Sequence, residues 1–215
     1  LFYYYMAYSG DGNASASIVD ASFSRNGGNG LTSWDPLAYS YGNGDATLTM
    51  AWVNMNDNAG YGMYTVAGAY ASDGNATATF TDVSANNNGE YGLFFGAYGA
   101  YADDGNATFN MTRVTANNNT NDGARFYYAI AQTISEGDAT VNISASSFSF
   151  NGGYGIYAPY GAYASDGNVT VNMTDVNFNN NGEYGLFFEA YGAYTGNGDA
   201  TFNMTRVTAN NNTNG

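Results

Sequence analysis

Residues 166–174 read Asp-Gly-Asn-Val-Thr-Val-Asn-Met-Thr, and related stretches occur seven times in the chain of 215 residues. Each copy contains a landmark glycine between two acidic or amide residues. The landmarks are Gly12, Gly44, Gly74, Gly105, Gly137, Gly167 and Gly198. Successive landmarks are 32, 30, 31, 32, 30 and 31 residues apart. The chain therefore consists of repeats of about 31 residues.

The residues that follow each landmark glycine alternate in polarity. Counted from that glycine, positions +2, +4 and +6 are apolar in all seven repeats, and position +3 is always Ser or Thr. This period of two predicts a half-buried β-strand with its hydroxyl residues facing water. Apolar residues at +9 and +11 predict a short second strand. An apolar residue at +19 opens a third strand after a glycine at +18.

Position +14 is Asn in every repeat, and we expect these amides to form a hydrogen-bonded ladder along the molecule. The ladder would contain Asn26, Asn58, Asn88, Asn119, Asn151, Asn181 and Asn212. Asn at +14 and Gly at +18 would supply the left-handed backbone of two corners. The expected fold is all-β: a right-handed parallel β-solenoid with three strands per rung and about seven rungs, forming one uncapped domain over residues 1–215.

Two stretches resemble a corner motif of a known family. Residues 88–94 (Asn-Gly-Glu-Tyr-Gly-Leu-Phe) and 151–157 (Asn-Gly-Gly-Tyr-Gly-Ile-Tyr) are similar to the corner of parallel β-helix repeats. Such repeats occur in pectate-lyase-like proteins and in secreted adhesins and surface filaments. The resemblance implies the fold. It leaves enzymatic, binding and structural roles open.

Composition excludes several classes of function. The chain has four Arg, no Lys, no His and no Cys, against 18 acidic residues, which gives a net charge of -14. A chain so acidic is not expected to bind nucleic acid. Its longest apolar runs are far shorter than the roughly 20 residues of a membrane helix, so membrane insertion is not expected either. The residues that usually act as general base, thiol nucleophile or soft metal ligand are missing. We therefore expect no enzymatic activity and no catalytic residues.

Ten Asn-x-Ser/Thr sequons are candidates for N-glycosylation. They begin at Asn13, Asn75, Asn106, Asn110, Asn118, Asn142, Asn168, Asn172, Asn203 and Asn211. Four of them share position +1 and four share position +5, and odd positions of the first strand should face outward. The alternative is a polar Asn/Thr ladder that only forms hydrogen bonds along the axis.

The turn around each landmark glycine is acidic. Its acids are expected to be solvated, and binding of Ca²⁺ between rungs is the alternative. The calcium candidates are Asp73, Asp104, Asp138 and Asp166. The neighbours Asp103 and Asp104 could resemble the acid pair of a glycoside hydrolase, but Asp103 looks like an insertion in a turn. No other cofactor is indicated.

Aromatic and hydroxyl rows suggest contact surfaces. Outward aromatic side chains at +20 and +22, such as Tyr64 and Trp34, could stack on glycans, pack between filaments or lie under a loop. Thr pairs such as Thr77 and Thr79 are similar to flat ice-binding ladders. The Asn residues that replace Thr at +5 in the last four repeats count against that interpretation.

The ends of the sequence match one another in repeat phase. Counted from Gly198, Gly215 stands at position +17; if it is aligned with the +18 glycines, Leu1 takes the +19 core place that Leu186 occupies. We therefore expect head-to-tail stacking of copies, or continuation within a longer repetitive polypeptide. The predicted function is a structural segment of an extracellular, glycosylated filament or adhesin stalk whose partners are further copies of itself. The alternative is a carbohydrate-active or carbohydrate-binding parallel β-helix protein.

Overall fold

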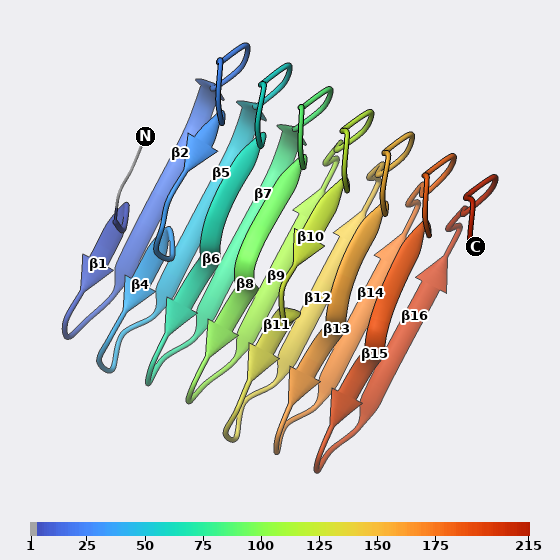
Figure 1. Ribbon diagram of the computed structural model, residues 1–215. Helices are drawn as coiled ribbons and strands as arrows, with labels where there is room; N and C mark the ends of the chain where they lie inside the picture. Colours follow the sequence, from blue (N-terminus) through green and yellow to red (C-terminus); the bar gives the residue numbers. More distant parts are fainter. Residues whose placement is uncertain (1–3) are drawn as a thin grey trace.

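The computed structural model describes residues 4–215, which form strands and turns and no helix. Leu1, the residue expected at the head-to-tail junction, lies outside the described residues. Two parallel sheets face each other across the core along the length of the molecule, and successive strands of each sheet come from successive repeats (Figure 1). Each repeat therefore contributes one layer to both sheets.

We call the first sheet the threonine sheet after its outward side chains. Its strands, in spatial order, are β2 (Ala14–Ser22), β5 (Ala46–Asn54), β7 (Ala76–Ser84), β9 (Ala107–Thr112), β12 (Ala139–Ser144), β14 (Val169–Thr174) and β16 (Ala200–Thr205). We call the second the aromatic sheet. Its strands are β1 (Ala7–Ser9), β3 (Leu31–Thr32), β4 (Ala38–Ser40), β6 (Met63–Ala71), β8 (Leu93–Ala102), β10 (Ala124–Phe126), β11 (Ala129–Thr133), β13 (Ile156–Ala164) and β15 (Leu186–Thr195).

Equivalent residues of neighbouring repeats lie directly above one another. Ala107 of β9 pairs with Ala139 of β12, which pairs with Val169 of β14, and all three hold position +2. The ladders of the threonine sheet continue in this register from β2 to β16. The predicted fold class is confirmed: the described chain is an all-β parallel solenoid with equivalent residues about 31 apart. It makes about six turns, against the expected seven rungs, because the seven repeats are joined by six repeat-to-repeat steps.

The short second strand of the prediction forms the third side of the coil. In β2, β5 and β7 it is the continuation of the first strand. In later turns it is reduced to isolated parallel bridges, such as Thr115 with Ser147. Side chains at +11 point from this side into the core, and Phe148 and Phe178 are fully buried there.

The corners of this third side differ from the expected ones. Left-handed backbone occurs at +8 and +13 of every repeat, not at Asn +14 or Gly +18. The residues with positive φ at +8 are Asp20, Trp52, Asp82, Arg113, Ala145, Asp175 and Arg206. Those at +13 are Arg25, Asp57, Asn87, Asn118, Phe150, Asn180 and Asn211. Each costs about 1–2 kcal/mol of backbone strain. Hydrogen bonds between turns offset this cost, as in the bond from Asn87 N–H to Asn117 O at 3.0 Å.

The glycine at +18 is needed for space. A Cβ on Gly92 would lie 2.6 Å from Gly123 O and 2.8 Å from Asn119 Nδ2. A side chain at this position would therefore push adjacent turns apart. The sequence predicted left-handed backbone at this glycine, but the structure needs it because a side chain would clash with the next turn.

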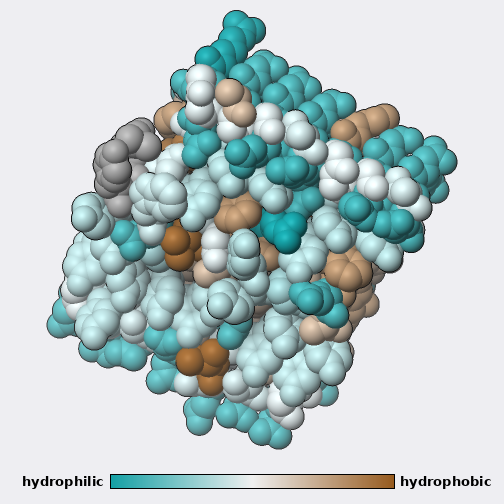
Figure 2. Space-filling view, viewed as in Figure 1, coloured by the Kyte–Doolittle hydropathy of each residue, from teal (hydrophilic) through white to brown (hydrophobic). Residues whose placement is uncertain are grey.

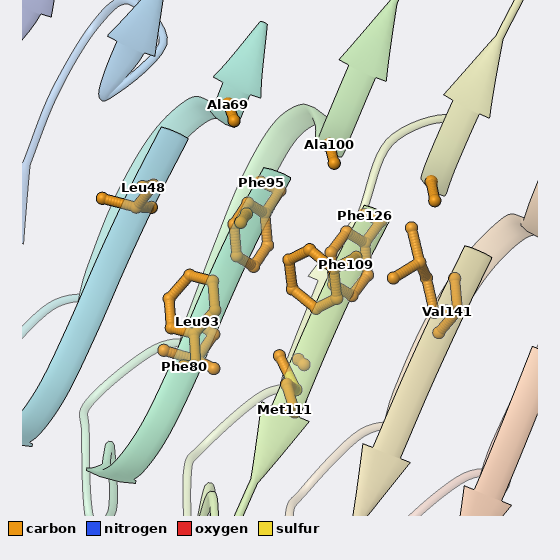
Figure 3. Packing of buried hydrophobic residues seen from close by; sticks show 14 of the residues in the cluster. Leu48, Ala69, Phe80, Leu93, Phe95, Ala100, Phe109, Met111, Phe126 and Val141 are labelled. Atoms are coloured by element: carbon orange, nitrogen blue, oxygen red, sulfur yellow. The ribbon is translucent and has the colours of Figure 1, made fainter. Parts of the chain in front are cut away.

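The core lies between the three sides and follows the predicted parity. Side chains at +2, +4 and +6 are buried from β5 to β14. Phe80 and Phe109 of the threonine sheet meet Phe95 and Phe126 of the aromatic sheet, and the rings of Phe95 and Phe126 stack at 4.5 Å (Figure 3). Burial of such large rings is the main apolar contribution to holding the two sheets together.

Candidate functional site

The seven Asn residues at +14 form a continuous hydrogen-bonded row. In each step the Nδ2 of one Asn donates to the Oδ1 of the Asn in the next turn, at 2.8–3.1 Å. The backbone N–H of the same donor residue bonds to that same Oδ1. Asn58, Asn88, Asn119, Asn151 and Asn181 are buried. The row has one direction, because every amide nitrogen points toward the C-terminal end.

This row ends at Asn212 without a partner. Asn212 Oδ1 accepts from Asn181, but the Nδ2 of Asn212 is buried and has no hydrogen-bond partner among the described residues. A buried donor left without a partner costs about 1–3 kcal/mol. Within the described residues, the last turn thus presents the Nδ2 of Asn212 at the place where every earlier Asn donates to the Asn of the following turn.

A second row follows position +1 and has the opposite direction. The side-chain oxygen at +1 accepts the backbone N–H at +1 of the next turn, as in the bond from Asn75 N–H to Asp45 Oδ1 at 2.8 Å. The same bond joins the +1 residues of all seven repeats, from Asn13 to Asp199. Asp138 therefore acts as a hydrogen-bond acceptor for Asn168 within the row.

The acidic side chains of the turns are spread along the molecule. The calcium candidates Asp73, Asp104, Asp138 and Asp166 are all exposed on these turns. Across residues 4–215 there is no group of three or more acidic side chains close enough to hold a metal ion. The carboxylate of Asp103 accepts hydrogen bonds from two phenols, Tyr101 at 2.5 Å and Tyr70 at 3.2 Å. Burial, together with Asp103, raises the pKa of both tyrosines.

The sequon asparagines fall into three environments. Asn13, Asn75, Asn106 and Asn168 are exposed on the turns. Asn118 and Asn211 occupy exposed left-handed corners. In the +5 group, the Nδ2 of Asn142, Asn172 and Asn203 each donates to the preceding Asn Oδ1 at 2.9–3.0 Å, and Asn110 Nδ2 contacts Thr79 Oγ1 at 3.5 Å. This geometry is the hydrogen-bonded ladder that the sequence left open as the alternative.

The outer face of the aromatic sheet is covered by stacked rings. Several equivalent rings of successive turns lie nearly parallel, as for Tyr64 and Phe94 at 5.3 Å and for Tyr163 and Tyr194 at 5.2 Å, whereas Tyr39 and Tyr70 meet edge to face. Stacking turns the ring faces toward one another and leaves edges and hydroxyl groups for solvent. In the view of Figure 2 the surface is mostly hydrophilic to neutral in colour, and hydrophobic residues form small separate patches.

The fourth turn interrupts the aromatic rows, which the sequence analysis did not foresee. Asp122 and Arg125 replace the aromatic residues that neighbouring turns carry at +17 and +20, and they form an ion pair at 2.9 Å. The Arg125 guanidinium lies 4.3 Å from the Tyr157 ring centroid. Burial raises the pKa of Asp122, while hydrogen bonds from Tyr154 N–H and Arg125 act in the opposite direction. The sheet strand is also split here into β10 and β11.

Two exposed tyrosines lie at that interruption. Tyr127 and Tyr128 separate β10 from β11, and both side chains are more than half exposed. Tyr157 donates to Glu189 Oε2 at 2.6 Å, and this bond is the main reason that its pKa is raised to about 12. Aromatic, cationic and acidic groups therefore meet in one region, a combination that the other turns lack.

Comparison of the chain with models of protein families, with curated proteins and with solved structures finds no match. The described residues contain no helix long and apolar enough to cross a bilayer. The structure supports the part of the resemblance that concerns the fold, a parallel β-solenoid.

Proposed function

We propose that the chain is a structural segment of an extracellular filament or adhesin stalk in which solenoids stack head to tail. The observation that supports this most directly is the unpartnered donor of Asn212 at the C-terminal end of the buried Asn row. Another rung of the same type would supply the missing Oδ1. The role is structural and involves no catalysis.

The opposite end of the solenoid is complementary. Asn26 Oδ1 accepts no hydrogen bond among the described residues, and it is the acceptor that Asn212 Nδ2 lacks. In the +1 row the hydrogen bonds run in the opposite direction: Asp199 at the C-terminal end offers a side-chain acceptor, and Asn13 at the N-terminal end offers a backbone donor. Stacking of a C-terminal end on an N-terminal end satisfies both rows. Two C-terminal ends brought together would place donor against donor at +14 and acceptor against acceptor at +1, and two N-terminal ends would do the reverse.

The C-terminal end also exposes core residues. Phe202 and Met204 of β16 occupy positions that are fully or almost fully buried in the preceding turns, yet here they are 38% and 48% exposed. A hollow beside them is lined by Phe188, Gly192, Ala193, Ala200 and Phe202. The backbone of β16 is a sheet edge, which readily pairs with another strand. Apolar burial and backbone pairing would therefore act together in a head-to-tail contact.

Electron microscopy and light scattering of the purified chain test this role. Stacked copies should form fibres with an advance of about 34 Å per chain, from seven rungs of about 4.8 Å. Met204→Asp would place a charge on the contact face and should prevent fibres while β-structure persists. Thr205→Asp, one residue away and facing outward, is the matched control and should leave fibres intact. Monodisperse monomers of the unmodified chain at high concentration would contradict the proposal.

Glycosylation is the second part of the proposal. We assign it first to the exposed turn sequons at Asn13, Asn75, Asn106 and Asn168. Glycans on all four Asn of the +5 group would stand about 4.8 Å apart, which leaves too little room for four adjacent sugars. Peptide mass mapping of material from the native source should find glycan on the turn group. Unmodified Asn at all ten sequons would contradict this part.

A carbohydrate-binding role is the second candidate, and the fourth turn favours it. Tyr127, Tyr128 and Arg125 of this turn, with Glu189 two repeats further along, combine exposed rings with hydrogen-bonding groups suited to a polar ligand. Affinity electrophoresis in gels that contain polysaccharide would test this role. Retardation that is lost in Tyr127→Ala and Tyr128→Ala, but kept in Thr140→Ala on the opposite sheet, would support it.

A further inference from the structure

The outward side chains of the threonine sheet form a surface without charge. They occupy positions +3, +5 and +7 of seven strands, and none of these 21 positions holds a charged residue. They are Ser15, Ser17, Val19, Thr47, Thr49, Ala51, Thr77, Thr79, Thr81, Thr108, Asn110, Thr112, Thr140, Asn142, Ser144, Thr170, Asn172, Thr174, Thr201, Asn203 and Thr205. All are at least partly exposed. In a chain of net charge -14, such a surface needs an explanation.

The charged residues nearest to this surface lie along its two rims. One rim is the row of exposed acidic turns, with Asp45 and Asp138 among them. The other rim is the +8 corner, where Asp20 has no ion-pair partner within residues 4–215 and Asp82 pairs with Arg113 at 2.6 Å. A second copy laid face to face on this surface would bring acidic rims near one another, which is unfavourable. A neutral partner would meet no such repulsion.

The surface is regular and stiff. Pairing in the threonine sheet proceeds without a register shift, so the outward residues form straight rows. Rows repeat about every 4.8 Å along the axis and about every 6.7 Å along the strands. Threonine is β-branched and has few side-chain rotamers. The Asn side chains of the +5 row are fixed by their mutual hydrogen bonds, and Thr112 is bonded to Ser144 at 3.2 Å.

This spacing is close to that of water molecules in ice. Hydrogen-bonded water oxygens lie about 2.75 Å apart, and tetrahedral geometry then puts second neighbours about 4.5 Å apart. The mismatch with a rung spacing of about 4.8 Å is therefore about 0.3 Å per rung; it adds up to about 0.9 Å over four rungs, so a block of about four rungs matches the lattice to within about 1 Å. Hydroxyl and amide groups in such rows can hold ordered water at lattice positions.

We propose that the threonine sheet binds ice. The replacement of Thr by Asn at +5, which seemed to count against this from the sequence, does not interrupt the rows in the structure. Each Asn presents both a donor and an acceptor within the row, and neighbouring side chains hold it in place. This activity goes beyond the structural role proposed above and does not require assembly of the chain.

A crystalline polysaccharide is the closest competing partner. Sugar rings characteristically pack on aromatic side chains, and no aromatic residue occupies any of the 21 outward positions. The stacked aromatic rows lie on the opposite sheet, and the exposed Trp52 of β5 stands at the +8 rim, outside these 21 positions. The composition of the surface therefore favours ice.

The test is thermal hysteresis of the 215-residue chain produced without glycans, measured on single ice crystals, with recording of crystal shape. We expect a gap between melting and freezing temperatures and faceted crystals. The double variant Thr108→Tyr with Thr140→Tyr places two bulky rings in the middle of the surface and should abolish both effects. Gln132→Tyr is the matched control, because it adds a Tyr to a row of tyrosines on the aromatic sheet and should retain them.

Three results would overturn the proposal. The first is the absence of hysteresis and of crystal shaping in the folded, unmodified chain. The second is an equal loss in Gln132→Tyr, which would show that the threonine sheet is not the active surface. The third is exclusion from growing ice together with binding to crystalline cellulose, which would assign the surface to polysaccharide. None of these results bears on fibre formation, which the Met204→Asp comparison tests separately.

Discussion

The one-way direction of the buried Asn row predicts that equivalent substitutions at its middle and at its N-terminal end differ greatly in cost. Asn119 Oδ1 accepts hydrogen bonds from Asn88 N–H and Asn88 Nδ2, both at 3.0 Å. Asn119→Ala removes this acceptor and leaves two buried donors without partners. At about 1–3 kcal/mol for each unsatisfied group, the loss of stability should be about 2–6 kcal/mol.

Asn26→Ala is the matched control. Asn26 is exposed and uses its side chain only as a donor toward Asn58 and the Phe23 carbonyl. Its removal leaves Asn58 Oδ1 still bonded to the Asn26 backbone N–H at 3.0 Å. No buried donor loses its partner, so the cost should stay at about 1 kcal/mol or less.

Equilibrium unfolding in guanidinium chloride, followed by circular dichroism, measures both variants. The midpoint should fall clearly for Asn119→Ala and little for Asn26→Ala, with similar slopes if cooperativity is kept. Equal shifts for the two variants would refute the assigned direction of the row. A shift for Asn119→Ala that corresponds to less than about 1 kcal/mol would refute the claim that the buried donors depend on it.

Three further predictions concern the core, the corner and an exposed phenol. Phe109→Asp should unfold the turns around β9, because an unpaired charge in the fully buried core costs several kcal/mol; limited proteolysis should then cut near Phe109, and a protease-resistant variant would contradict the inward assignment. Gly92→Ala should destabilise the chain by about 1–3 kcal/mol through the contact with Gly123 O, measured as a lower unfolding midpoint. The bond to Glu189, followed by burial, raises the pKa of Tyr157 from 10.0 to about 12, so the stabilisation by the bond should be complete below about pH 10 and disappear as pH rises through 12. Glu189→Gln should lower that pKa, as followed by tyrosinate absorbance, and an unchanged titration would exclude the bond.

Much of the fold was accessible from the sequence because the relevant signals are local. Alternation at +2 to +6 assigns each side chain to the core or the surface, since successive residues of a strand point to opposite sides. The repeat length of about 31 residues then places equivalent positions above one another. The columns of Asn, including those at +1 and +5, therefore followed from spacing alone, and so did the uncharged composition of the threonine sheet.

Other features depended on how the coil closes. The left-handed corners at +8 hold Asp, Trp, Arg and Ala, a set with no common preference for that backbone, so no residue pattern marked them. The direction of the Asn row and the free Nδ2 of Asn212 are relations between side chains about 31 residues apart, and they exist only when the turns are stacked. The same holds for Asp122 and Arg125, which fill a gap between aromatic rings of the neighbouring turns. Sequence determined which residues form rows, because strand parity is local; tertiary structure decided what each row bonds to, because those partners come from adjacent turns.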